Sequence, residues 1–191
     1  LSSASVNEIL KTFDGLSIEM LNKLQNLLID LNEVEKTILA SGKFTTSSLK
    51  DILGILMNWQ QSISVVLPEI FTASAIALAV HEAGFIYALA EKKQPKLEGD
   101  KLFNKFRKVP YAEGQLIDLI FPNIAEDVRK KVEYVIRDGI YQGQTSQKIV
   151  QRIKGTKKLN YSDSLLNQTR NAIDAEVRTA RSHVSNISYL D

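Results

Sequence analysis

The clearest chemical signal in this sequence is a group of basic side chains in the last third of the chain. No aspartate or glutamate occurs between Asp138 and Asp163, whereas lysine or arginine occurs five times in that window. Cationic groups without neighbouring carboxylates attract the phosphate or carboxylate groups of a partner. We therefore predict that a nucleic acid or an acidic partner is contacted by these residues: Lys148, Arg152, Lys154, Lys157 and Lys158.

Residues that could catalyse a reaction or hold a metal ion are scarce. The pair His81-Glu82 begins like the helix of a zinc protease, but the second histidine would have to stand at the position of Phe85. The chain contains two histidines and no cysteine, and it has no glycine-rich phosphate loop and no nucleophile elbow. The sequence therefore predicts no catalytic residue, no metal site and no cofactor.

A turn between two helices is expected to position the basic residues. Gly143 can adopt the left-handed conformation that ends a helix, and Thr145 or Ser146 can cap the next helix. In that next helix, expected over residues 147–153, three apolar residues should pack inward: Ile149, Val150 and Ile153. Three basic residues should face outward: Lys148, Arg152 and Lys154.

The first half of the chain is predicted to form long helices. Ser17 has the character of an N-cap, and apolar residues follow it at helical spacing up to a stop at Ser41-Gly42. A second helix is expected to open at Thr46 or Ser47. Pro68 then either begins another helix or kinks a continuous one.

The segment Ile70 to Ala90 is rich in alanine and nearly free of charge. A membrane span needs about 20 uninterrupted apolar residues, and this run is broken after about 11 by His81-Glu82. Small side chains let helices approach closely, so we expect a buried central helix of a bundle. A segment that meets a membrane or pore is the alternative.

Charge and composition divide the chain into three regions. Residues 1–95 carry a net charge of −3 and residues 96–191 carry +5. We predict a helical bundle over 1–94, a basic linker or hinge over 95–122 and a helical region over 123–191. In the polar stretch Lys92 to Pro110, Phe103 and Phe106 would form either a nucleic-acid platform or part of a docked loop. The apolar run Leu116 to Phe121 is compatible with a helical turn or a lone strand.

The expected fold class is mainly α, with elongated or bundled long helices and a smaller basic C-terminal helical region. The chain begins at Leu1 and stops at Asp191 within a helical pattern, so we expect a fragment of a longer protein.

Residues of about 120–190 resemble the phage Mu F-like head-morphogenesis family. The resemblance consists of a helix, a Gly-x-x-x-Gly-x-Ser-like turn, an isoleucine-containing helix, a basic loop, and a helix with Arg-Thr and a downstream Asn. The family's glutamate after Arg-Thr is Ala180 here. The matching positions are Gly139, Gly143, Thr145 or Ser146, Ile149, Ile153, Arg178, Thr179 and Asn186.

The resemblance implies a minor structural head protein of a tailed bacteriophage, made in the host cytoplasm and located in the virion. Such a protein associates with portal or capsid proteins in the head interior and takes part in head assembly, DNA packaging or DNA ejection. It is expected to be non-enzymatic, to contact packaged DNA without sequence preference, and to form a homo-oligomer.

Two other functions remain open. A helix-turn-helix regulator could use the same turn, but it needs a recognition helix a few residues later, whereas the next long helix is expected to start near Ser162. A membrane-active ejection protein could expose Ile70 to Ala90, although a membrane partner is not what the composition favours. For Arg178, Thr179 and Asn186 the alternative role is to hold the last helix to its neighbours.

Overall fold

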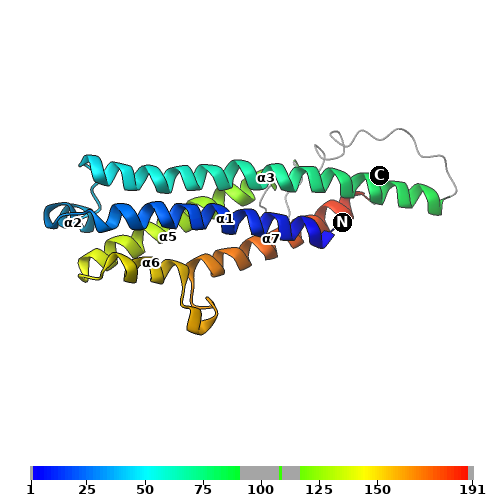
Figure 1. Cartoon of the computed structure of the whole chain (residues 1–191). Helices are drawn as coiled ribbons and strands as arrows, with labels where there is room; N and C mark the ends of the chain where they lie inside the picture. Colours follow the sequence, from blue (N-terminus) through cyan, green and yellow to red (C-terminus); the bar gives the residue numbers. More distant parts are fainter. Residues whose placement is uncertain (1, 91–107, 109–116, 189–191) are drawn as a thin grey trace.

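The computed structural model describes residues 2–90, 108 and 117–188 of the chain. These residues form an all-α fold in which long helices pack side by side into an elongated bundle (Figure 1). No strand occurs among them, as the sequence predicts. The α-helices are α1 (Ser2–Ile29), α2 (Glu33–Ala40), α3 (Ser47–Leu89), α5 (Ile120–Tyr141), α6 (Ser146–Lys154) and α7 (Leu165–Ser188). Two short 3₁₀ turns accompany them, η1 (Ile117–Leu119) and η2 (Lys157–Leu159).

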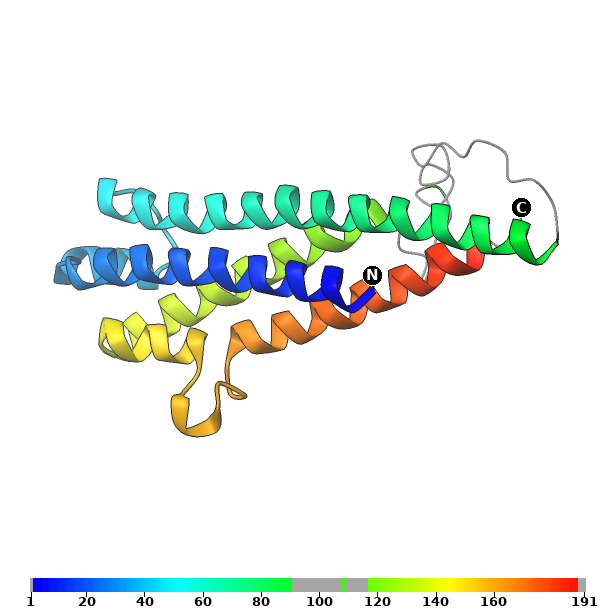
Figure 2. The same cartoon turned by 45° about the vertical axis from the view of Figure 1, so that its right-hand side comes forward.

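One apolar core joins helices from both halves of the chain. Helix α3 packs against α1, α5 and α7, and α1 also contacts α6 and α7 (Figure 2). The rings of Phe13 and Trp59 lie 6.4 Å apart between α1 and α3, and those of Phe71 and Phe121 lie 6.1 Å apart between α3 and α5. Such aromatic pairs add to the stabilisation from buried area. The helices before and after the predicted linker therefore bury their apolar faces against one another.

Helix α1 starts earlier than the sequence predicts. Ser17 is not its N-cap but lies in its interior, 2% exposed, where its Oγ accepts a hydrogen bond of 3.2 Å from Trp59 Nε1. The buried residues Val6, Ile9 and Phe13 continue the apolar stripe toward the N-terminus, so α1 extends over them. The Ser17 hydroxyl, which led us to predict a helix start, instead accepts a hydrogen bond from the buried indole of Trp59.

The same predicted helix is also interrupted before Gly42. Helix α1 ends at Ile29 and α2 begins at Glu33, because Asn32 acts as a new N-cap whose side chain accepts from the Glu35 amide at 2.8 Å. The stop at Ser41-Gly42 is confirmed, since Gly42 has φ of +83°. Thr46 then precedes α3, and its Oγ1 accepts from the Leu49 amide at 3.3 Å.

Helix α3 is continuous through Pro68, so this proline does not begin another helix. The prediction that Ile70 to Ala90 forms a buried central helix is confirmed at the start of the segment but not at its end, where residues 88–90 are exposed. Phe71 and Ala75 are in the core, but Leu89 is 67% exposed, because the end of α3 extends beyond the start of α1 (Figure 2). By length and composition one described segment, Ser47–Leu78, could cross a membrane, a test that core helices also pass.

The apolar run before Pro122 is helical rather than a strand. It forms η1 and the first residues of α5, with Ile120 and Phe121 buried. Pro122 is tolerated there because the first turn of a helix needs no amide donor. The stretch Lys92 to Pro110, with Phe103 and Phe106, lies outside the described residues except for Lys108, which is exposed.

Candidate functional site

The turn between α5 and α6 forms as its glycine and hydroxyl residues predict. Gly143 has φ of +71°, and the Gln144 amide donates to the Gly139 carbonyl at 2.8 Å while the Gly143 amide donates to Ile140 at 3.0 Å. This pair of bonds is the Schellman arrangement that ends a helix. Of the two candidate caps, Thr145 is the N-cap of α6, and its Oγ1 accepts from the Lys148 amide at 3.2 Å. Ser146 is the first residue of α6.

Gly139 and Ile149 set the distance between α5 and α6. A Cβ atom on Gly139 would lie 2.5 Å from Cγ1 and 3.0 Å from Cδ1 of Ile149, which is fully buried. Val150 and Ile153 are buried as well, so the predicted inward face of α6 is confirmed. The two glycines of the pattern have different tasks: Gly143 supplies backbone conformation, and Gly139 supplies space.

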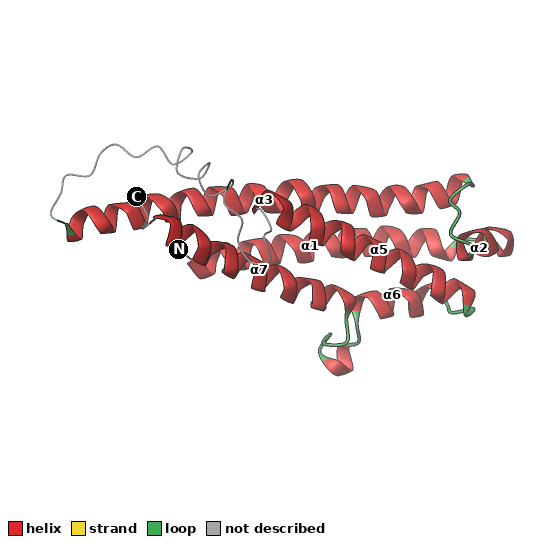
Figure 3. Cartoon of the chain, turned by 180° about the vertical axis from the view of Figure 1, so that it is seen from behind, coloured by secondary structure: helices red, strands yellow, loops and turns green. Residues whose placement is uncertain are grey.

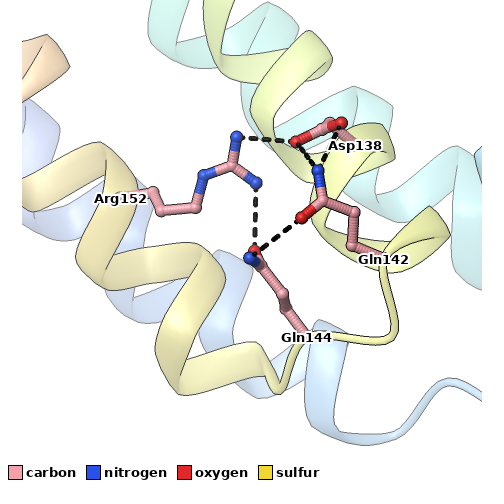
Figure 4. Close-up of polar contacts among 4 residues, drawn as sticks. All are labelled: Asp138, Gln142, Gln144 and Arg152. Atoms are coloured by element: carbon pink, nitrogen blue, oxygen red, sulfur yellow. Dashed lines mark hydrogen bonds and ion pairs between the residues drawn. The ribbon is translucent and has the colours of Figure 1, made fainter.

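Arg152 does not face outward as predicted. Its Nη2 lies 2.7 Å from Asp138 Oδ2, and its Nη1 donates to Gln144 Oε1 at 3.0 Å (Figure 4). Asp138 also accepts from Gln142 Nε2 at 3.0 Å. The Arg152 and Asp138 side chains are 27% and 19% exposed, so a partly desolvated ion pair draws Arg152 back toward the end of α5. We call these four residues the α5–α6 clamp: Asp138, Gln142, Gln144 and Arg152.

Residues 155–164 form a finger loop that projects from the bundle between α6 and α7 (Figures 1 and 3). Its base is closed by Gly155, at φ of +87°, where a Cβ would lie 2.7 Å from Cβ of Ser164. Ser164 is 1% exposed and serves two helices: its Oγ donates to the Ile153 carbonyl at 2.9 Å and accepts from the Asn167 amide at 3.1 Å. One hydroxyl thus links the end of α6 to the start of α7.

Asp163 stabilises the finger loop through hydrogen bonds from another residue of the loop. Its Oδ1 accepts from the Thr156 amide at 2.9 Å and its Oδ2 from the Thr156 hydroxyl at 3.2 Å. The amide hydrogen bond from Thr156 lowers the pKa of Asp163 from its ordinary value, and the Thr156 hydroxyl and the charge of Lys148 lower it further. The Tyr161 amide adds a 2.8 Å bond to the Thr156 carbonyl, so the loop is bonded across its base.

Four of the five predicted basic residues are exposed around the finger loop. Lys148, Lys154, Lys157 and Lys158 are all exposed, and in the described part of the chain none of them forms an ion pair. Lys154 Nζ lies 5.9 Å from the centre of the Tyr161 ring, a cation–π distance. The four lysines are therefore exposed near or within the finger loop, whereas Arg152 is bound to the other residues of the α5–α6 clamp.

Three of these lysines line one groove. It lies between the outer face of α6 and the finger loop, has a volume of about 510 Å³, and is reached by one residue of α1. No acidic residue contributes to its wall among the described residues. We call it the basic groove, and its lining residues are Gln25, Thr145, Gln147, Lys148, Val150, Gln151, Lys154, Gly155, Thr156, Lys157 and Tyr161. Lys158 lies in the finger loop but does not line the groove.

The family-motif residues of α7 are not part of the basic groove. Arg178 is exposed, with Nε 3.1 Å from Asp174 Oδ1, and Thr179 Oγ1 donates to the Ala175 carbonyl at 2.9 Å. Both contacts lie within α7 and join residues four positions apart along the same helix. Asn186 belongs to α7, but its side chain lies outside the described residues.

Ala180 explains one departure from the family pattern. It is fully buried, and a glutamate in its place would put a carboxylate into the core. Nearby, burial lowers the pKa of Arg181, and the charge of Arg178 lowers it further. Arginine nevertheless stays charged at any physiological pH.

The residues that the sequence does not single out are those that join two elements. Asp138 and Gln144 hold Arg152, and Asp163 and Ser164 close the finger loop. The signal for Ser164 is a hydroxyl directly before the apolar residues of α7, yet the predicted start near Ser162 is three residues before the first residue of the helix, Leu165. The whole segment 155–164 separates α6 from α7, far longer than the helix-turn-helix connection of about three or four residues.

Comparisons with known proteins found no match: no family model, no curated protein and no solved structure matches the chain. In the described part of the chain no group of three or more histidine, aspartate or glutamate side chains could hold a metal ion. The candidate site consists of ammonium, amide and hydroxyl donors around the groove. The α5–α6 clamp and the hydrogen bonds across the base of the finger loop hold these groups in position.

Proposed function

We propose that the chain is a minor structural protein of the head of a tailed bacteriophage. It associates with portal or capsid proteins in the head interior and takes part in head assembly, DNA packaging or DNA ejection. The role is non-enzymatic, so no catalytic residue and no cofactor is assigned. The proposal starts from the resemblance of residues 120–190 to the phage Mu F-like head-morphogenesis family.

The observation that carries the proposal is the contact between Gly139 and Ile149. In the resemblance, a glycine near the end of one helix and an isoleucine in the next are pattern residues. Here a Cβ on Gly139 would come within 2.5 Å of the fully buried Ile149, so the packing of this isoleucine against α5 needs a glycine at position 139. The family pattern thus has a packing reason in this chain, which supports treating the resemblance as structural and not as chance spacing.

The distribution of polar groups also favours a binding and assembly role. The clamp residues Asp138 and Arg152 are engaged with each other, and three of the four exposed lysines line the basic groove. A long helical body offers extended surfaces for protein partners, while the lysines allow sequence-independent approach of DNA. Portal or capsid proteins and packaged DNA are accordingly the proposed partners.

The proposal is tested by mass spectrometry of purified, DNA-filled heads of the phage that encodes the chain. We expect its peptides in these heads at a copy number far below that of the major capsid protein. A chain that stays in the lysate supernatant and is missing from purified heads would contradict the proposal. Deletion of its gene should leave infected cells with heads that fail in assembly, packaging or ejection, whereas normal plaque formation would count against it.

A membrane-active ejection protein is separated from this proposal by a leakage assay. Dye-filled anionic vesicles should stay intact when the protein is added at neutral or acidic pH, because the apolar face of α3 is packed against α1, α5 and α7. Rapid leakage would favour the membrane-active alternative.

A further inference from the structure

We propose that the basic groove binds the phosphodiester backbone of nucleic acid, with Lys148, Lys154 and Lys157 as the phosphate-contacting residues. The inference rests on the proposed function only in naming packaged DNA as the source of the backbone. Binding itself is a property of the isolated chain and can be measured without a phage.

The first argument is charge without compensation. Lys148, Lys154 and Lys157 line the same groove, and none of them forms an ion pair in the described part of the chain. Asp163 attracts Lys148 without forming an ion pair with it, and its hydrogen bonds from Thr156 keep it ionised. It therefore offsets part of the charge of Lys148 but leaves Lys154 and Lys157 without a carboxylate partner in the described part of the chain. Three like charges that converge on one groove repel one another, and an anion in the groove relieves that repulsion.

The second argument is the character of the groove wall. Besides the lysines, it carries three amides, from Gln25, Gln147 and Gln151, and the hydroxyl-bearing residues Thr145 and Thr156. The three amides and the Thr145 hydroxyl can donate hydrogen bonds to phosphate oxygens, whereas the Thr156 hydroxyl already donates to Asp163. An acidic protein partner would also need apolar area at the centre of its interface, and the wall is more polar than apolar, with Val150 and Tyr161 as its largest apolar side chains. These side chains suit a ligand that is recognised by charge and hydrogen bonds.

The third argument is shape and rigidity. The groove runs between α6 and the finger loop, and its volume of about 510 Å³ is of the size that takes an organic ligand. The finger loop is ordered by Gly155, Asp163 and Ser164, so the position of Lys157 is set before a ligand arrives. One strand of a nucleic-acid backbone can lie along such an open groove.

The groove residues read no base sequence. Lysines and amides that meet phosphate oxygens fix the position of a nucleic acid without carrying sequence information. Three phosphate contacts predict a slope of about −2.7 in a plot of log affinity against log salt concentration. Raising salt from about 50 mM to about 200 mM should therefore weaken binding about 40-fold.

The experiment is fluorescence anisotropy of the whole chain with labelled duplex DNA of random sequence across a salt series. The test variant replaces the three groove lysines (K148Q, K154Q, K157Q). Its matched control replaces three lysines that are ion-paired elsewhere, Lys23 with Glu19, Lys130 with Glu126 and Lys131 with Asp127 (K23Q, K130Q, K131Q). Both variants lose the same net charge, so any difference between them reports position. Circular dichroism confirms that both are folded.

We expect the unchanged chain and the matched control to bind with the steep salt dependence, and the groove variant to bind about 100-fold more weakly at low salt with a nearly flat slope. Equal binding by the groove variant and the control would overturn the inference. Tight binding to one defined sequence would overturn it in favour of a regulator. Displacement of the DNA by polyglutamate as readily as by polyphosphate would assign the groove to an acidic protein instead. Groove-dependent binding to anionic vesicles would assign it to a lipid surface.

These outcomes separate the two proposals. A chain that binds no DNA but is present in purified heads leaves the structural head protein standing and removes the groove assignment. A chain that binds DNA through the groove but is missing from heads leaves the groove assignment standing and removes the structural head protein.

Discussion

A Cβ atom on Gly139 would lie 2.5 Å from Cγ1 of Ile149, far inside the separation of about 3.5–4.0 Å at which carbon atoms attract each other. The two residues come from consecutive helices, and the chain reverses direction between them at Gly143. The close approach of α5 to α6 at this point is therefore possible only because residue 139 has no Cβ atom. The position of α6, which carries the groove lysines Lys148 and Lys154, depends on this contact.

Replacing Gly139 by alanine should lower the free energy of unfolding by about 1–3 kcal/mol, because Ile149 is fully buried and has to move or force the helices apart. The measurement is urea denaturation followed by circular dichroism. The control is Gly15→Ala in α1, where nothing lies within 4 Å of the added atom. That change should raise stability by up to about 1 kcal/mol through helix propensity. A gain at both positions would show that the Gly139 contact has no energetic weight.

Gly139 and Gly143 differ in how far their roles in this site can be predicted from the sequence. The role of Gly143 follows from local chemistry, because a residue between two helices that must adopt positive φ is most often glycine. The role of Gly139 depends on which side chain of α6 faces it, and that is a tertiary contact. A helix pattern specifies its own apolar face but not the partner that will meet it.

The same limit explains the other differences between pattern and structure. Ser17 has the side chain of an N-cap, yet its hydroxyl is used by Trp59 from α3. Arg152 has the spacing of an outward-facing residue, yet Asp138 from α5 draws it back. The all-helical fold and the inward face of α6 were predictable because they follow from periodicity. Polar side chains at the edges of helices take whichever partner the packing brings near.

Arg152 should matter for stability and not for DNA binding. Arg152→Gln removes the 2.7 Å ion pair to Asp138 and should lower the free energy of unfolding by about 1–3 kcal/mol, because the carboxylate is mostly buried. Lys154→Gln should leave stability nearly unchanged and weaken salt-dependent DNA binding instead. Urea denaturation and anisotropy on the two variants give the comparison.

A double-mutant cycle checks the Arg152 assignment. If Arg152 and Asp138 act on each other, the loss from Arg152→Gln should be smaller when Asp138→Asn is already present. Additive losses would mean that the ion pair contributes nothing of its own. A loss of DNA affinity in Arg152→Gln as large as that in Lys154→Gln would return Arg152 to the contact surface.

Ser164→Ala should lower the free energy of unfolding by about 1–2 kcal/mol, as expected for loss of an N-cap. The effect should lie toward the upper end of that range, because the same hydroxyl also serves the Ile153 carbonyl at a buried position. Ser182→Ala is the control, since its exposed hydroxyl donates to the Arg178 carbonyl within the same helix. That change should stay within about 0.5 kcal/mol of the unchanged chain. Equal effects at the two serines would contradict the double role of Ser164.

The finger loop should open under acid conditions through Asp163. The Thr156 amide lowers the pKa of Asp163 in the folded chain, so the carboxylate stabilises the loop at every pH above the ordinary aspartate value of about 3.9. That stabilisation is lost as pH falls through the lowered folded pKa, when the protonated carboxyl accepts less strongly from Thr156. In ¹H–¹⁵N spectra the Thr156 amide should therefore titrate with a midpoint below about 3.9. Asp163→Asn should abolish that titration while other carboxylates still respond, and a Thr156 midpoint at or above the ordinary aspartate pKa would show that the Asp163 contact does not hold the loop.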